Sequence, residues 1–131
     1  MPLGIEKENN PEKNKINVVS IDRLKNRSDF LRTAKGKMVH KKAFVLQGRS
    51  RSDSSTNIRI GFTCTKKVGN AVLRNLAKRR LREVAQYIFP NNGLDGWDYV
   101  LVGRKDLTTK YNFEMMKKDL TQALHQLHSF K

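Results

Sequence analysis

The sequence predicts an α/β (α+β) fold, a two-layer sandwich in which helices cover one face of a small central sheet. Three observations lead to this prediction. Residues 58–65 alternate apolar and polar side chains, as a strand with one buried face does. Residues 98–103 are typical of another apolar strand. Residues 70–88 and 112–127 repeat apolar side chains at helical spacing, so each helix has one stripe for the sheet.

The expected order of elements is α-β-β-β-α-β-α, or the same order with one early strand paired as a hairpin. With the helices on one face, the other face of the sheet stays open for a ligand. These elements belong to one expected domain, residues 20–131, which follows a mobile tail, residues 1–19. The tail mixes Glu, Lys and Asn without periodicity, and its charges nearly balance.

The domain is expected to begin with a short helix and two strands. Ser28 can cap a helix that runs to Lys35 and stops at Gly36. One side of this helix carries Phe30, Leu31 and Ala34. A strand over residues 39–48 follows, and its centre consists of Phe44, Val45 and Leu46. A turn region rich in Ser, Asp and Asn then leads into the strand at 58–65.

The central helix is expected to begin after a turn at Gly69, with Asn70 as N-cap, and to end near Ile88, before Pro90 and Gly93. Its apolar stripe consists of Leu73, Leu76, Ala77, Leu81, Val84 and Ile88. An adjacent face carries Arg74, Lys78 and Arg82, with Asn75 and Arg79 further round. Arg80 falls within the apolar arc, so we expect its stem on the core and its head in water. Asn112 can cap a last helix, which packs through Phe113, Met116, Leu120, Leu124 and Leu127.

The charge pattern indicates a polyanionic partner. The formal net charge is +15, and the segment from Arg59 to Arg82 holds eight basic residues and no acid. Like charges at i, i+4 destabilise a helix by about 0.2–0.5 kcal/mol per pair, so such a face is a mild defect unless phosphates neutralise it. The alternative is a solvated face without a partner, but the charge of the whole chain favours phosphate binding.

RNA suits this arrangement better than DNA. A major-groove reader needs a helix-turn-helix or a zinc module, and the sequence shows neither. An open sheet face beside a basic helix is typical of RNA binding. Phe30 and Phe44 are candidates for stacking on unpaired bases, and core packing is an equal alternative for each. The turn at Gly69 could present helix N–H groups to an anion, or it could serve the turn alone.

The sequence offers no self-sufficient catalytic site. His40, His125 and His128 stand in no motif with a carboxylate. His125 and His128 could hold a metal, but exposed histidines at a frayed helix end are the favoured interpretation. Cys64, the single cysteine, is expected to be a buried thiol. Because there is no signal core and no apolar run of about 20 residues, we expect a soluble, cytoplasmic protein that binds no membrane.

Residues 59–83, RIGFTCTKKVGNAVLRNLAKRRLRE, resemble the signature of the bacterial ribonuclease P protein component, a strand followed by a KK-G-AV-RN-KR-R series. The segments RLKNRSDFLRTAKGK and DYVLVGRKDL resemble the family's N-terminal element and its last strand. The resemblance covers roughly Asp22 to Leu127. It implies a left-handed β-α-β crossover within the predicted order, against the general preference for right-handed connections.

The resemblance also implies a function, the removal of the 5′ leader from precursor tRNA by a ribonucleoprotein endonuclease. One catalytic RNA subunit per protein would hold the Mg²⁺ ions that serve the hydrolysis. The protein itself would have no catalytic residue, no tightly bound metal and no DNA partner. By matching position, the residues that face RNA would be Lys66, Lys67, Asn70, Arg74, Asn75, Lys78, Arg79 and Arg82. The residues that line or flank the leader cleft would be Phe30, Lys35 and Val45.

Two departures from the family pattern bear on this expectation. Leu76 stands where members often have an arginine, and Arg80 would partly compensate. Ala34 and Gln47 stand where members often have aromatic residues, so leader binding is expected to depend more on charge and hydrogen bonds. A ribosomal-type structural RNA-binding protein is the main alternative function. A protein-only nuclease and a DNA-binding protein are further alternatives with less support.

Overall fold

The structure, a computed structural model, describes residues 21–53 and 55–129, so the predicted mobile tail, residues 1–19, lies outside the described residues. Five strands, four α-helices and a short 3-10 helix, η1, follow one another in this range. Their bounds are β1 (Ile21–Arg23), α1 (Arg27–Ala34), β2 (Lys37–His40), β3 (Phe44–Ser50), β4 (Ile58–Thr63), η1 (Lys66–Val68), α2 (Ala71–Asn92), β5 (Trp97–Gly103), α3 (Leu107–Lys110) and α4 (Phe113–His128). None of the helices in this range has the length and apolar character needed to cross a membrane.

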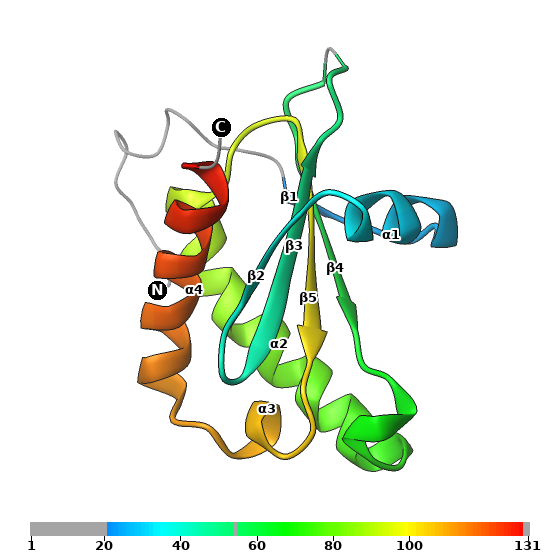
Figure 1. The fold of residues 1–131 in the computed structure, drawn as a ribbon, viewed down its shortest axis with the longest axis vertical. Helices are drawn as coiled ribbons and strands as arrows, with labels where there is room; N and C mark the ends of the chain where they lie inside the picture. The colour runs from blue at the N-terminus through cyan, green and yellow to red at the C-terminus, as the bar shows by residue number, and fades with distance from the viewer. Residues whose placement is uncertain (1–20, 54, 130–131) are drawn as a thin grey trace, which may run out of the picture.

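The strands form one mixed sheet in the order β1-β4-β5-β3-β2 (Figure 1). β4 runs parallel to β1 and β5, whereas β3 runs antiparallel to β5 and β2. The single strand predicted over residues 39–48 is in fact the hairpin of β2 and β3. The chain reverses after His40, and the Lys41 N–H donates to the Phe44 carbonyl at 2.9 Å. The hairpin alternative of the predicted order is therefore the right one. The sequence pattern does not predict the short, exposed edge strand β1.

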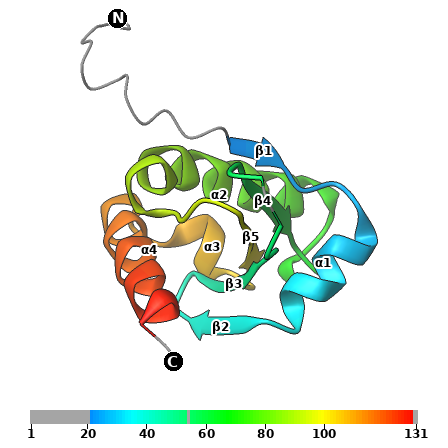
Figure 2. The same cartoon turned by 90° about the horizontal axis from the view of Figure 1, so that it is seen from above.

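Helices α2 and α4 pack on one face of the sheet, whereas α1 lies against the other face (Figure 2). The prediction that helices cover a single face is right for the two long helices and wrong for α1. α2 connects the adjacent parallel strands β4 and β5. Viewed from the α2 side with these strands pointing up, β5 lies to the left of β4 (Figures 1 and 2). The crossover is thus left-handed, as the resemblance implies.

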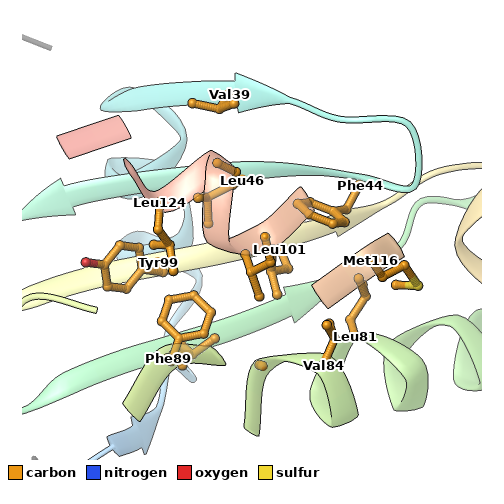
Figure 3. Close-up of a cluster of buried hydrophobic side chains, with 14 of the residues drawn as sticks. Val39, Phe44, Leu46, Leu81, Val84, Phe89, Tyr99, Leu101, Met116 and Leu124 are labelled. Carbon is orange, nitrogen blue, oxygen red and sulfur yellow. The ribbon is translucent and has the colours of Figure 1, made fainter. Parts of the chain in front are cut away.

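The hydrophobic core lies between the sheet and helices α2 and α4 (Figure 3). The central strand β5 directs Tyr99 and Leu101 into this core, and both are fully buried. Successive residues of a strand point to opposite faces, so Val100 and Val102 face the side of α1. α4 contributes the predicted residues Met116, Leu120, Leu124 and Leu127, all fully buried.

Local capping explains where the helices begin. Asn70 and Asn112 cap α2 and α4 as predicted, and each side-chain oxygen accepts the backbone N–H three residues further on at 3.0 Å. The predicted start of α1 is wrong by two residues, because Asn26 and not Ser28 is the N-cap, and Ser28 lies within the first turn of the helix. The backbone carbonyl of Asn26 accepts the first N–H bonds of this helix, without a side-chain cap.

α2 is longer than the sequence predicts, because it runs to Asn92 and includes Pro90 in its last turn. Proline removes one N–H donor there, but the turn still closes through the Gly93 N–H, which donates to the Phe89 carbonyl at 2.9 Å. The buried stripe is also shifted, and consists of Ala77, Leu81, Val84, Ala85 and Phe89. Leu73 is exposed and Leu76 half-buried, because the first turns of α2 project past the end of the sheet (Figure 1).

Arg80 does not turn its head into water, which corrects the expectation from the helical wheel. Its guanidinium donates to the carbonyl oxygens of Thr109 at 3.1 Å and Tyr111 at 2.6 Å. These carbonyls lie at the end of α3, where backbone acceptors have no partner within the helix. Arg80 therefore joins α2 to the segment between α3 and α4, and its guanidinium is not free to compensate for the arginine that the family resemblance implies at position 76.

Candidate nucleic-acid interface

The turn from β4 into α2 places two lysines at the start of the basic face. The Thr65 hydroxyl accepts the Lys67 N–H at 3.3 Å and opens η1, which leaves Lys66 and Lys67 exposed. Gly69 follows with φ 144°, a conformation that only glycine adopts readily. A Cβ atom at this position would lie 2.6 Å from the Leu73 side chain. Turn geometry alone therefore accounts for Gly69.

The basic face of α2 consists of Arg74, Lys78, Arg79 and Arg82, with Asn75 beside them. Arg79 and Asn75 are exposed, and the other three are half-buried. Within the described residues, no carboxylate lies within 4 Å of any of these cations and none of them has a hydrogen-bond partner. By contrast, Arg59 of β4 and Arg51, which follows β3, are ion-paired with the buried Asp98. The charges on α2 are therefore available to an external anion.

Asn70 and Cys64 lie near the basic face of α2, and each has a more limited chemical role than its residue type allows. The Oδ1 atom of Asn70 caps the helix, so only its amide N–H group is free to donate to RNA. The Cys64 thiol is half-buried, less than its inward position in the pattern predicts. Burial raises the pKa of this thiol, although the positive charges of Lys78 and Arg74 act in the opposite direction. The thiol is therefore neutral at pH 7 and is no nucleophile.

The open face of the sheet forms a cleft with α1 as one wall, and its volume is about 510 Å³. Phe30 of α1 lies directly over Gly61 of β4: a Cβ atom on Gly61 would come within 2.5 Å of the Phe30 ring. The missing side chain lets α1 approach the sheet. The lining residues are Lys25, Arg27, Phe30, Leu31, Ala34, Gln47, Phe62, Thr63, Val100 and Val102.

Ion pairs hold α1 against this face. Asp29 is buried, accepts a hydrogen bond from Arg32 at 2.6 Å, and lies 3.4 Å from the Arg59 guanidinium of β4. The hydrogen bond from Arg32 lowers the pKa of the Asp29 carboxyl, and the charge of Arg59 acts in the same direction while burial opposes both. Asp29 thus stays ionised and links α1 to the sheet.

The three residues predicted to line or flank the cleft take three different positions relative to it. Phe30 lines the cleft. Val45 is half-buried and pairs across the ladder with Val102, so its side chain shares the face of the cleft. Lys35 is exposed at the C-cap of α1 and does not line the cleft. Phe44 is fully buried in the core, which decides its two interpretations in favour of core packing.

Sequence reasoning missed the floor and the cationic rim of the cleft. The floor residues Val100 and Val102 had a signal, because they alternate with Tyr99 in a strand whose other face is buried. No sequence pattern indicates the rim residues Lys25 and Arg27, because their positions depend on the path of the chain from β1 into α1.

The positions of the histidines and carboxylates in residues 21–53 and 55–129 bear on whether the protein itself could hold a metal ion. Within the described ranges, no group of three or more His, Cys, Asp or Glu is arranged to hold a metal ion. His125 is exposed as expected, but His128 is half-buried with its Nε2 atom 2.7 Å from the Tyr99 hydroxyl. The buried carboxylates Asp29 and Asp98 are both bound to arginines. These donors therefore do not fit a Mg²⁺ ion held by the protein.

Fold and site together define a class of protein: a small, basic α/β domain that offers nucleic acid a charged helix and an open sheet cleft. A sequence model of the Ribonuclease P family matches residues 20–128. The chain belongs to the ribonuclease P protein family, and this membership assigns it to tRNA processing as the RNA-binding part of a ribonucleoprotein.

Individual relatives agree with this assignment. The "Ribonuclease P protein component" of Ruegeria pomeroyi is 48% identical over 109 residues, which span 82% of this chain and 87% of that protein. The protein of the same name from Caulobacter vibrioides is 42% identical over 109 residues, 83% of this chain and 72% of the relative. The RNase P protein of Staphylococcus aureus has a TM-score of 0.66 and 28% identity, covering 83% of this chain and 97% of that structure. The RNase P protein of Thermotoga maritima has a TM-score of 0.62 and 29% identity, covering 84% and 98%.

Proposed function

We propose that the chain acts within ribonuclease P by holding the catalytic RNA on the basic face of α2 and the 5′ leader of precursor tRNA in the cleft beside α1. The observation that carries this proposal is the division of charge between the two surfaces. The cations of α2 have no ionic partner among the described residues, whereas on the cleft side Arg59 is paired with Asp29 and Asp98, and the cations of the cleft lining are Lys25 and Arg27 at its rim. The first surface suits a polyanion, and the second suits one unpaired strand.

RNA on α2 would stabilise the helix that binds it. Arg74, Lys78 and Arg82 follow at i, i+4 spacing and repel one another, and phosphates remove that repulsion. Lys66 and Lys67 extend the same charge to the turn before the helix. Side-chain amides beside these cations add donors for sugar hydroxyls and backbone turns.

The cleft fits a single-stranded leader. The ring of Phe30 stands at the wall, and stacking of a base on an aromatic ring contributes about 1–3 kcal/mol. Val100 and Val102 offer an apolar floor, and Lys25 and Arg27 bring positive charge to the rim. Ala34 and Gln47 also line the cleft, so two positions that are often aromatic in relatives offer no ring here. Leader affinity is therefore expected to depend strongly on the rim charges.

In this proposal, the catalytic RNA and the Mg²⁺ that it holds carry the hydrolysis. The residues of this chain bind and orient the substrate. The cleft fixes the path of the leader, and the α2 face reduces repulsion between RNA phosphates. The protein thus favours precursor tRNA, which has a leader, over mature tRNA, which has none.

Reconstitution with the catalytic RNA of the same organism tests this function. Precursor cleavage should require the RNA, and adding the protein should lower KM for the precursor. Cleavage by the protein without RNA would show a protein-only nuclease. Cleavage that is unchanged by the protein would instead favour a structural RNA-binding protein of the ribosomal type.

Salt dependence tests the electrostatic part of the proposal. If about five side chains meet single-stranded phosphates, log K for precursor tRNA should fall with log salt with a slope near −3.5.

Arg74→Ala and Lys78→Ala should each weaken binding of the catalytic RNA without unfolding the domain. Lys117→Ala is the matched control, because Lys117 lies on α4 and pairs with Glu114. A slope near zero, or two α2 variants that bind like the control, would contradict the assignment.

A further inference from the structure

A second cationic groove lies outside both the cleft and the basic face of α2. It has a volume of about 590 Å³, and its lining residues come from the ends of β2 and β5, the β2–β3 turn, α3 and the first half of α4. Figure 1 shows where these elements lie in the fold. We call it the end groove. Its cations are Lys41, Lys42 and Arg104, and its apolar surface comes from Leu107, Tyr111 and Met115.

Backbone contacts hold the end groove in one shape. The Arg104 guanidinium donates to the Lys41 carbonyl at 2.9 Å, which joins the segment after β5 to the hairpin turn. The Thr108 hydroxyl accepts the Arg104 N–H at 2.7 Å and donates to the Ala43 carbonyl. Segments more than 60 residues apart in the sequence are therefore fixed together, while Lys42 and Arg104 stay exposed.

Positive charge dominates the end groove. Within the described residues, no carboxylate forms an ion pair with Lys41, Lys42 or Arg104, and the Lys41 ammonium contacts only the neutral Gln122 at 3.5 Å. Asp119 is the one carboxylate that lines the groove. It lies beside the Tyr111 phenol, whose pKa is raised by burial and further by this carboxylate. A net positive charge therefore remains for a ligand.

The apolar surface between the cations favours an unpaired nucleotide over a duplex. Leu107 and Met115 are each 41% exposed, and the half-buried ring of Tyr111 lines the groove with them. A duplex would meet the protein through its phosphates and sugars, and would leave this apolar surface unused. A base that is splayed out of a loop or bulge can stack on an aromatic ring while its phosphates meet cations.

We propose that the end groove binds a second, unpaired segment of the catalytic RNA, with phosphates at Lys42 and Arg104 and a base against Tyr111. The identity of the RNA rests on the proposed function. Arg80 of α2 binds the carbonyls of Thr109 and Tyr111, so the end groove and the α2 face belong to one rigid unit. One RNA that reaches both surfaces gains affinity, because its second contact is intramolecular.

Charge-neutral variants of the full-length protein test this site with the catalytic RNA. Lys42→Gln and Arg104→Gln should each weaken RNA binding several-fold, and should each make the slope of log K against log salt shallower by roughly 0.7–0.9. Arg104→Lys should restore most of the affinity. Lys117→Gln is the matched control, because Lys117 lies over the Tyr87 ring, outside the end groove, and should leave the slope unchanged.

The α2 variant Arg74→Gln separates this inference from the proposed function. If Arg74→Gln weakens RNA binding but Lys42→Gln and Arg104→Gln match the control, the end-groove proposal is wrong and the α2 assignment stands. If Arg74→Gln also binds RNA like the control, the assignment of the α2 face in the proposed function is wrong, and the end-groove proposal that rests on it falls with it. Selective binding of an acidic peptide at the end groove, with RNA affinity unchanged in these variants, would also overturn the proposal.

Photo-crosslinking supplies a direct readout. The variant Tyr111→p-benzoylphenylalanine, irradiated in the reconstituted holoenzyme, should crosslink to unpaired nucleotides of the catalytic RNA. The same photoreactive residue in place of Tyr87, which is exposed on α2 but outside the end groove, is the control for random contact. Crosslinks at position 111 that do not exceed those at position 87 would refute the site.

Discussion

The Arg59 guanidinium donates two hydrogen bonds of 2.7 Å each to the Asp98 carboxylate, on the sheet face that carries α1. Asp98 is fully buried and also accepts from Arg51 at 2.9 Å. Arg59 in turn lies 3.4 Å from Asp29 of α1. A chain of charges thus runs from the central strand to α1, so the wall of the leader cleft is held by residues that do not themselves line the cleft.

Removal of Asp98 should destabilise the protein strongly. In Asp98→Ala, Arg51 and Arg59 lose their shared counter-charge, and breaking a buried pair in this way costs about 3–5 kcal/mol. Urea unfolding should show this loss as a lower midpoint. Asp95→Ala removes an exposed carboxylate three residues earlier and should change the free energy of unfolding little. Equal stability of the two variants would mean that the charge chain contributes nothing.

The close approach of Phe30 to Gly61 predicts a change in substrate preference. In Gly61→Ala, the new Cβ atom would lie 2.5 Å from the Phe30 ring, so the ring or α1 must shift, at about 1–3 kcal/mol. The affinity for precursor tRNA should fall, while the affinity for the catalytic RNA should hold. Binding to precursor and mature tRNA measures this difference.

A double-variant cycle is the control for the Gly61 prediction. In the Phe30→Ala background the clash is gone, so Gly61→Ala should cost much less stability and should not alter leader binding further. If Gly61→Ala lowers precursor affinity equally in both backgrounds, the effect does not act through Phe30.

Stability should depend on pH through His128. Its Nε2 atom lies 2.7 Å from the Tyr99 hydroxyl, which also accepts the Leu94 N–H. In the neutral tautomer that carries its proton on Nδ1, the imidazole accepts the Tyr99 O–H at Nε2. Burial lowers the pKa of His128 below its ordinary 6.5, with help from the charges of Lys37 and His125. Below pH 6.5 the unfolded chain binds the proton first, so the free energy of unfolding should decrease as the pH falls toward the folded pKa.

Urea unfolding on both sides of pH 6.5 checks the His128 prediction. His128→Gln keeps an acceptor but cannot titrate, so its stability should vary less with pH in this window. His125→Gln removes an exposed histidine of the same helix and should retain most of the wild-type dependence. A wild-type protein whose stability is flat through this window would contradict the prediction.

Local rules predicted the parts of the fold that local interactions decide. The caps Asn70 and Asn112 follow from a side chain bonding to its own helix, and the burial of α4 follows from its apolar period. The β2–β3 hairpin had no comparable signal, because its turn consists of Lys41, Lys42 and Ala43 without Gly, Asn or Pro. The placement of α1 on the second face depends on Asp29 meeting Arg59, a pair 30 residues apart that no periodicity reveals.

The same distinction holds for the candidate site. The basic face of α2 could be predicted, because helical spacing alone gathers its cations. The cleft could be predicted only in part. Its floor follows from the alternation of side chains in β5, but its rim depends on the path that the backbone takes between β1 and α1. The resemblance implies that Lys35 lines or flanks the cleft; the structure places it at the C-cap of α1, next to the lining residue Ala34 but not in the lining itself.

Leu76 offers a gain-of-function test of the α2 face. It is half-buried, not in the core as the helical wheel suggests, and lines a surface groove with Asn75, Arg79 and Arg82. Leu76→Arg adds a cation at the position where the family resemblance implies one, so the catalytic RNA should bind more tightly, with a salt slope steeper by roughly 0.7–0.9. Stability should change by no more than about 0.5 kcal/mol, because the side chain can extend into solvent.

Leu94→Arg is the control for a general effect of added charge. Leu94 is 45% exposed and precedes β5, whereas the first turns of α2 lie near the opposite end of the sheet (Figure 1). An arginine at position 94 should therefore raise RNA affinity far less than one at position 76 in a titration at matched salt. If both variants gain equally, the extra affinity reflects net charge alone. The groove around Leu76 would then have no specific place in the RNA interface, and the contact would have to lie on the Arg74 and Lys78 side of α2.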